Sequence, residues 1–358
     1  MVAVAAALVT LPAVVGAWPV HADAIAPTEL ANRIMASAAT SYQGLATVRG
    51  GASFPDVGVA EDPLALLGET SKLRAWYGAP RHWRVDQLDT TGEHDTYSSP
   101  VPGTGRSTVQ TWDSQDRRVR RLDNRTELRL PWSFDVLPPE LGRRLVHEST
   151  SEELSPLDPV RVAGRTAVGL RIVPADPVST IERADVWADA TTGVVLRVDV
   201  IAKSTGKPAL ESRFLEVSLS APSESTITFV APPGARISNR GGQDLVQQLE
   251  RANFAKLPAM VAGLKRRTPG TTPVGTYGNG LTAVAIAAIP NPLVPSGAQT
   301  VLPPQPRPWG GDARLVSTPL LNVMIVSKNG TTYAIVGLVN LEMLDRVAVA
   351  LLSTDGAK

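Results

Sequence analysis

The chain has 358 residues, which is more than one ordinary hydrophobic core supports, so we expect two domains. It is 43% hydrophobic and has a formal net charge of +1, so no overall positive field attracts nucleic acid, and we expect no nucleic-acid partner. The sequence contains no cysteine, which excludes disulfides, thiolate metal sites and cysteine nucleophiles.

The N-terminal segment is almost entirely apolar from residue 2 to residue 20 and is followed by an Ala22-Asp23-Ala24 cleavage pattern. This arrangement is typical of a secretory signal, although the usual basic start is missing. An uncleaved anchor is the alternative, because about 19 apolar residues nearly reach the roughly 20 that span a bilayer. Pro12 and Pro19 weaken that alternative. We expect residues 1–24 to be an export signal or an N-terminal anchor, and the protein to be exported to the periplasm or cell envelope.

The segment that follows predicts one helix and then a series of short strands. Thr28 can cap the helix, and Leu30, Ile34, Met35 and Ala38 fall on one stripe. The predicted elements up to residue 147, in chain order, are a helix at 27–39, strands at 41–48, 72–77, 82–88, 108–112 and 117–122, and a short helix at 139–147.

The segment from Val162 to Val200 predicts three consecutive strands, because Leu170 and Ile172, and then Leu196 and Val198, recur at every second position. Further strands are predicted at 210–219 and 227–230, and Pro232-Pro233-Gly234 is expected to end the sheet. Residues 25–237 therefore predict one domain with a long antiparallel meander. A sheet of this size must curl, and a curled sheet with one dry face leaves a groove.

The remaining sequence predicts a linker passing into a helix at 238–253 and a small α+β domain at 254–358. The signals are a strand pair at 277–289, a proline-rich loop at 290–312, a hairpin of strands 320–327 and 332–338, and a closing helix at 341–352.

Catalytic and metal-binding patterns are missing from the sequence. It contains no G-x-S-x-G elbow, P-loop or dinucleotide-binding glycine motif, and its four histidines form no H-x-x-x-H pair. Glu93-His94-Asp95 is the only stretch that resembles metal chemistry, and it is expected in a polar turn. We expect no catalytic residue, no metal, no cofactor and no enzymatic activity.

Large aromatic residues recur on the predicted strands of the first domain. Each tryptophan alone fits an ordinary core, but the group favours an apolar cavity for acyl chains. The expected lining residues of that cavity are Trp76, Trp83, Val85, Trp112, Leu170, Ile172, Trp187, Leu196 and Val198.

Arginines crowd one short segment of the first domain, interleaved with acidic residues. A charged edge strand that prevents aggregation is one interpretation. The other is a contact for an anionic lipid headgroup, a membrane surface or an acidic partner. The candidate contact residues are Arg117, Arg118, Arg120 and Arg121.

Several local motifs resemble those of the lipoprotein carriers (LolA) and the periplasmic sigma-E regulatory proteins (RseB/MucB). The most specific is Val162-Ala163-Gly164-Arg165 before a strand, together with Trp187-Ala188-Asp189 and Gly193. The other motifs are Tyr42-Gln43-Gly44, Arg74 to Gly78 with Arg81 to Val85, Thr111 to Ser114, Phe229 to Ala235, and, in the second domain, Leu257-Pro258, Tyr277 to Leu281 and Tyr333 to Gly337.

The resemblance implies an α+β, mainly β fold, with a curved antiparallel half-barrel sheet closed by helices and followed by a smaller α+β domain. It implies a non-enzymatic regulator outside the cytoplasm that binds acyl chains and modulates a membrane anti-sigma factor. The alternative is a carrier of lipid or lipoprotein in the cell envelope. The second domain favours the regulator, and the proline- and alanine-rich composition suggests an actinobacterial type.

Overall fold

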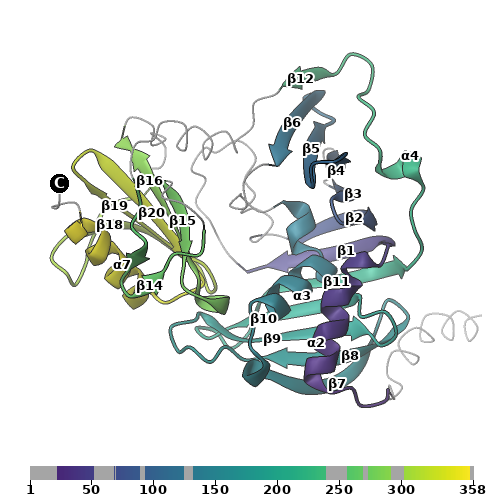
Figure 1. Ribbon diagram of the computed structural model, residues 1–358, viewed down its shortest axis with the longest axis horizontal. Coiled ribbons are helices and arrows are strands. Elements are labelled where there is room, and N and C mark those ends of the chain that lie inside the picture. Colours follow the sequence, from purple (N-terminus) through teal and green to yellow (C-terminus); the bar gives the residue numbers. More distant parts are fainter. Residues whose placement is uncertain are drawn as a thin grey trace, which may run out of the picture.

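The computed structural model describes residues 22–51, 68, 70–88, 93–124, 132–238, 256–268, 273–291 and 302–354. Two sheets organise this part of the chain, each with its own buried apolar cluster (Figure 1). The first sheet has 12 strands and the second has 6. We call the parts built on them the large unit and the small unit. The predicted division near residue 237 stays a prediction, and most of the predicted linker lies outside the described residues.

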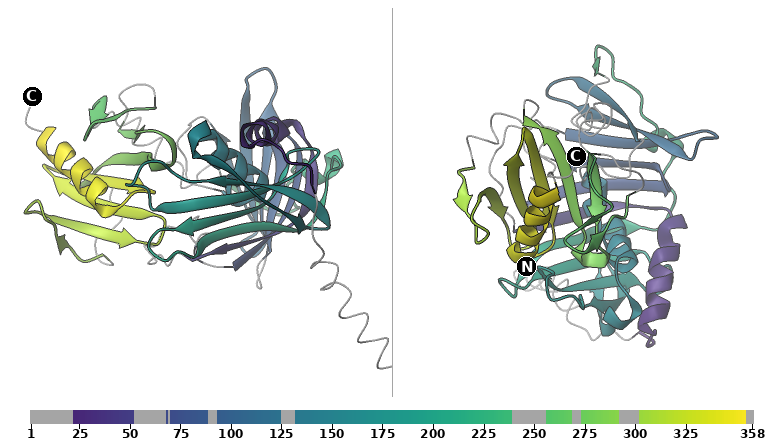
Figure 2. Two further views of the ribbon diagram at one scale, coloured as in Figure 1. Left: turned by 90° about the horizontal axis from the view of Figure 1, so that it is seen from below. Right: turned by 60° about the vertical axis from the view of Figure 1, so that its left-hand side comes forward.

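The 12-stranded sheet follows the chain closely, in the order β12-β6-β5-β4-β3-β2-β1-β11-β10-β9-β8-β7. All neighbours are antiparallel except β12, which runs parallel to β6. The sheet is strongly curved and is not closed (Figure 2). The strands are β1 (Tyr42–Gly50), β2 (Thr70–Ala79), β3 (His82–Leu88), β4 (Glu93–Val101), β5 (Arg106–Asp113), β6 (Arg118–Asn124), β7 (Leu154–Val162), β8 (Arg165–Ile172), β9 (Ile181–Asp189), β10 (Val195–Ala202), β11 (Pro208–Ser218) and β12 (Arg236–Ser238).

The residues of the turn set the register of the hairpin that β7 and β8 form. Val162 pairs with Arg165 across Ala163 and Gly164, and both central residues have positive φ, 48° and 76°. Positive φ at both central positions defines the type I′ turn, whose twist matches that of the two strands. The turn fixes which side chains of β8 face inward, because a slip of one residue would exchange the two faces.

Two helices cover one face of this sheet, which we call the inner face (Figure 1). They are α2 (Pro27–Ala36) and α3 (Pro138–His147), preceded by the 3-10 turn η3 (Ser133–Val136). The apolar side of α2 buries Leu30 and Ile34 against the sheet. Gly142 lets α3 approach β10, because a Cβ added at this position would lie 2.7 Å from a methyl of Val195.

The segment 219–238 returns from β11 past the other strands to the far edge of the sheet (Figure 1). Its one-turn helix α4 (Glu224–Ile227) packs on β2 and β3, and the Phe229 ring meets the Tyr97 ring edge-on at 5.1 Å. Arg117 Nη2 donates to Pro233 O at 2.7 Å, just before β12 pairs with β6. The expectation that Pro232-Pro233-Gly234 ends the sheet is therefore wrong, because β12, which consists of three residues, follows it and joins the sheet.

The small unit is a sheet in the order β15-β16-β20-β19-β18-β17, with one helix packed on it. The helix α7 (Leu341–Thr354) buries Met343, Leu344, Val347 and Ala348 against β19 and β20. The strands are β15 (Val274–Tyr277), β16 (Val284–Pro290), β17 (Gln305–Pro306), β18 (Asp312–Ser317), β19 (Asn322–Lys328) and β20 (Thr331–Gly337), beside a separate pair, β13 (Met260–Val261) and β14 (Leu264–Lys265). The remaining 3-10 turns are η1 (Ser37–Ala39), η4 (Ser151–Glu153) and η5 (Gly280–Thr282).

The predicted fold class is confirmed: the described chain is mainly β, with a curved antiparallel sheet covered by helices and a smaller α+β unit. The predicted strand at 227–230 is wrong, because its start forms α4. Besides β12, two strands of the large sheet were missed, and so were β13, β14, β17 and β18 of the small unit. The polar stretch that contains Glu93-His94-Asp95 is β4, and the proline-bearing segment before Val162 is β7. No helix in the described part of the chain is long and apolar enough to cross a membrane.

Candidate functional site

The nine residues predicted to line a cavity divide between the two faces of the large sheet. Cross-strand partners point to the same face, and Trp83 and Val85 share the inner face with the aromatic stack under the helices. The Trp83 ring stacks on Phe134 of η3 at 4.1 Å. The residues on this face are Trp83, Val85, Leu170, Ile172, Leu196 and Val198, and all of them are buried.

The other three predicted residues, Trp76, Trp112 and Trp187, lie on the opposite, outer face. The guanidinium of Arg84 lies 4.9 Å from the centre of the Trp76 ring, and that of Arg197 lies 4.8 Å from Trp187. Such stacking covers one face of each indole, and Trp187 is also buried in the large unit's apolar cluster. One acyl chain cannot touch all nine residues, because the sheet separates the two groups.

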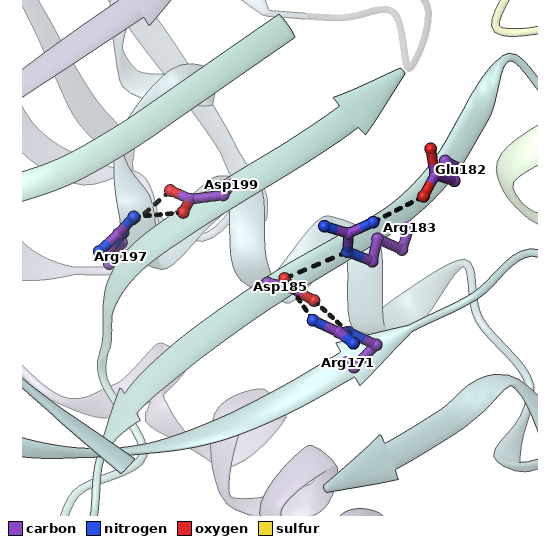
Figure 3. A network of polar contacts seen from close by, with 6 residues as sticks. All are labelled: Arg171, Glu182, Arg183, Asp185, Arg197 and Asp199. Carbon is purple, nitrogen blue, oxygen red and sulfur yellow. Dashed lines mark hydrogen bonds and ion pairs between the residues drawn. The ribbon is translucent and has the colours of Figure 1, made fainter. Parts of the chain in front are cut away.

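The sequence contained a signal for this division. Trp187 shares its strand parity with Arg183, Asp185 and Asp189, and Trp76 shares its parity with Lys72 and Arg74. Charged residues at every second position mark the outer face. In Figure 3 the carboxylate of Asp185 accepts a hydrogen bond from Arg171 and forms an ion pair with Arg183 at 3.5 Å, and Asp199 accepts a hydrogen bond from Arg197.

A second polar cluster lies on the outer face between β3 and β4. Arg84 Nε donates to Asp86 at 2.6 Å, and its Nη2 lies 3.2 Å from Asp95 on the next strand. Burial, together with the charge of Asp86, raises the pKa of Asp95 to about 7, although Arg84 opposes the shift. This cluster has the charge distribution of a buried ion-pair network. No group of three or more metal-ligating side chains occurs among the residues that the structure describes.

The four candidate contact arginines do not form one patch. Arg117 holds a positive φ of 48° in the turn before β6 and binds Pro233 O. Arg118 pairs with Asp116 at 3.2 Å and shares a face with Arg120, whereas Arg121 is on the other face. The charged-edge interpretation is wrong for β6, because β6 is not an edge strand. Its edge opposite to β5 pairs with β12. The headgroup or partner contact stays a prediction.

Among the residues that the structure describes, an apolar pocket lies between the two units. It is a pocket of ≈ 120 Å³. Every lining residue except Thr318 is apolar. The large unit supplies Leu141, Leu145, Ile181, Val200, Ala209 and Leu210, and the small unit supplies Thr318, Pro319, Leu320, Leu321 and Leu338.

Backbone pairing between the units frames this pocket. Thr180 N donates to Leu338 O at 2.9 Å, and Asn340 N donates to Val178 O at 2.8 Å. Between them, Ser179 and Val339 form an antiparallel bridge. The chain that enters β9 is thereby joined to the chain that leaves β20, and two pocket residues, Ile181 and Leu338, lie directly beside the joint.

The small unit's wall of the pocket is a tight turn. Thr318 Oγ1 donates to Leu321 O at 2.8 Å and accepts from Leu321 N at 2.8 Å, which holds Pro319 and Leu320 between them. The Thr180 hydroxyl reaches across the interface and donates to Leu320 O at 2.5 Å. The turn is therefore ordered and presents apolar side chains to the large unit.

A pocket of this size with an apolar lining takes up apolar groups. An apolar cavity of roughly 150 Å³ stays dry and binds benzene-sized molecules. None of the nine predicted lining residues is among its walls. The missed signal was the sequence Thr318-Pro319-Leu320-Leu321, a turn between two strands that carries leucines where polar residues are usual.

No protein-family model matches this sequence, and no curated protein does. Among solved structures, the chain is similar to the crystal structure of MucB, with 19% identity, coverage of 93% of this chain and 98% of that chain, and a TM-score of 0.49. It is also similar to the MucA/MucB complex of Pseudomonas aeruginosa, with 17% identity, coverage of 90% and 96%, and a TM-score of 0.45.

A LolA-superfamily protein from Nitrosomonas europaea is similar at 11% identity, with coverage of 57% of this chain and 99% of that chain and a TM-score of 0.23. The two families that the sequence motifs resemble are thus among the similar solved structures. The actinobacterial type stays a prediction.

Proposed function

We propose that this protein is a non-enzymatic, lipid-sensing regulator outside the cytoplasm, which binds acyl chains and modulates a membrane anti-sigma factor. The apolar pocket between the two units is the observation that carries the proposal. Each methylene buried in such a pocket contributes about 0.8 kcal/mol, so a chain end binds there without a polar anchor.

The position of the pocket supports sensing rather than storage. A ligand changes the conformation of a protein only by binding its alternative states with different affinity. An acyl chain in this pocket contacts Leu210 of the large unit and Leu320 of the small unit, so its affinity depends on how the units are joined. The Thr180–Leu320 hydrogen bond lies at the same joint. We therefore propose that lipid binding is coupled to the geometry between the two units.

The arginines of β6 and of the turn before it supply the proposed contact to a membrane surface or an acidic partner. Arg117 and Arg121 are exposed, and Arg118 is half-buried. A guanidinium forms charge-assisted hydrogen bonds to phosphate or carboxylate, which suits an anionic headgroup or an acidic ectodomain.

A carrier of lipid or lipoprotein is the second candidate function. The large unit alone supplies six of the pocket's lining residues, including Leu141 and Leu145 of α3, so much of the apolar wall belongs to the part that resembles carriers. A carrier would move lipid between vesicles without any protein partner.

The test begins with native mass spectrometry of residues 25–358 purified from the source organism, followed by identification of any extracted lipid. Titration of the same protein with an anti-sigma ectodomain then follows, with and without that lipid. If the protein is a regulator, it should form a stable complex with the ectodomain, and lipid should weaken that complex. Lipid transfer between vesicles with no ectodomain binding would establish the carrier instead, and the absence of both would contradict the two functions.

A further inference from the structure

Two buried hydrogen-bond donors lack a partner beneath α3. They are the hydroxyl of Tyr42 on β1 and the Nη1 of Arg143 on α3, and neither has a hydrogen-bond partner in the structure. The Tyr42 side chain is 0% exposed, and Arg143 is 7% exposed. Buried polar groups almost always find a partner, so a pair of unused donors in one place requires an explanation.

The two donors belong to one cluster. The Tyr42 ring stacks on Tyr77 at 5.0 Å, and the Arg143 guanidinium lies 5.9 Å from the centre of the Tyr77 ring. Burial raises the pKa of Tyr42 far above its usual range, and the charge of Arg143 is the strongest opposing influence. Tyr42 and Arg143 therefore border the same ring, that of Tyr77.

The charge of the cluster defines the chemistry of its missing partner. Arg143 Nη2 already donates to Glu140 Oε2 at 2.7 Å, which neutralises the guanidinium. An additional anion would leave the buried site with a net negative charge, which is costly. Two donors and no net charge suit an uncharged acceptor with two lone pairs, such as a carbonyl oxygen.

We propose that Tyr42 and Arg143 form a subsite for the carbonyl oxygen of an ester- or amide-linked acyl chain. The inference deepens the proposed function and rests on it. The lipid-free protein keeps two donors unused, and the ligand's carbonyl satisfies both. Tyr77 provides the contrast within the same stack, because its hydroxyl already donates to Ala38 O at 2.7 Å.

The experiment is a competition between two lipids that differ only at the carbonyl. Equal amounts of dipalmitoyl phosphatidylglycerol and its dihexadecyl ether analogue are offered in mild detergent, and native mass spectra give the ratio of the two complexes. Wild-type protein is expected to prefer the ester about tenfold, a ratio that corresponds to the net binding free energy of one to two hydrogen bonds. Tyr42→Phe and Arg143→Lys should each lower that preference severalfold, whereas the matched control Tyr77→Phe should keep it.

The melting temperature of the lipid-free protein is the second readout. Tyr42→Phe removes no hydrogen bond and should leave the melting temperature unchanged or higher, whereas Tyr77→Phe should lower it. An equal fall for both variants would show that the Tyr42 hydroxyl already has a partner, such as an internal water, and would overturn the subsite. Equal binding of ester and ether would also overturn it but leave the proposed function standing. Binding of neither lipid would instead contradict the proposed function.

Discussion

Arg267 and Glu148 form a bidentate ion pair that joins the small unit to the large one. Arg267 Nη1 lies 2.8 Å from Glu148 Oε2, and Nη2 lies 2.9 Å from Oε1. Glu148 caps the C-terminal end of α3, the helix whose Leu141 and Leu145 line the interdomain pocket. The pair therefore fixes one end of the pocket helix to the opposite unit.

This ion pair should contribute measurably but modestly to stability. Both side chains are partly exposed, at 36% and 21%, so solvent screens much of the attraction. A double-mutant cycle with Arg267→Ala and Glu148→Ala should give a coupling of about 0.5–1 kcal/mol in urea unfolding. Additive effects of the two substitutions would show that the pair does not join the units in solution.

Filling the pocket should impair acyl binding without unfolding the protein. Leu338→Phe adds a ring to the pocket wall, and the Leu338 carbonyl that accepts from Thr180 is kept. The loss of room for two or three methylenes should weaken binding of a long-chain lipid by about tenfold or more. Leu215→Phe is the matched control, because Leu215 is exposed on β11 and is not part of the pocket wall. Equal affinities in a titration would place the acyl chain elsewhere.

Gly193 should be irreplaceable for a reason that goes beyond its backbone angle. Its φ is 71°, and an added Cβ would lie 2.3 Å from Arg33 O, at the end of α2. Gly164 has a similar φ of 76° but no atom within 4 Å of the added Cβ. Gly164→Ala should cost about 1 kcal/mol of unfolding free energy.

Gly193→Ala should cost about 3 kcal/mol or more, because either α2 or the turn must also move. Denaturant unfolding of the two variants separates the strain of the backbone angle from the close approach. Equal costs would mean that α2 does not dock on this turn.

The outer-face carboxylate Asp95 should make stability depend on pH. Burial raises its pKa in the folded protein to about 7, compared with about 4 in the unfolded chain. The folded state therefore holds the proton more tightly, so the stability from this group is fully present below about pH 4 and is lost as the pH rises to about 7. Asp95→Asn should flatten that fall in the free energy of unfolding between these pH values. An unchanged pH profile would assign the titration to another group.

The strands that the sequence predicts well are those with local signals. Leu170, Ile172, Leu196 and Val198 alternate within single strands, and turn residues separate those strands, so their existence and inner face follow from periodicity. The strand β4 carries Asp95, Thr96 and Ser98 as buried polar residues, and a periodicity of apolar residues cannot detect it.

The features that escaped prediction depend on contacts between distant segments. β12 exists because Arg236 to Ser238 pair with β6, more than a hundred residues earlier, although a Pro-Pro-Gly sequence precedes it. The pocket joins Leu141 and Leu210 to Leu320, and no local pattern brings these residues together. The tryptophans Trp76 and Trp187 were assigned to a cavity by residue type, whereas stacked arginines shield them on the outer face.

The most direct test of acyl-chain binding between the two units is a crystal structure of the protein with a fatty acid that carries bromine at its methyl end. Bromine gives an anomalous signal that locates the chain end without interpretation of the surrounding density. We expect one strong peak between Leu141, Leu210 and Leu320, in the pocket between the two units. A peak outside this pocket, or saturating fatty acid with no peak in the protein, would contradict that expectation.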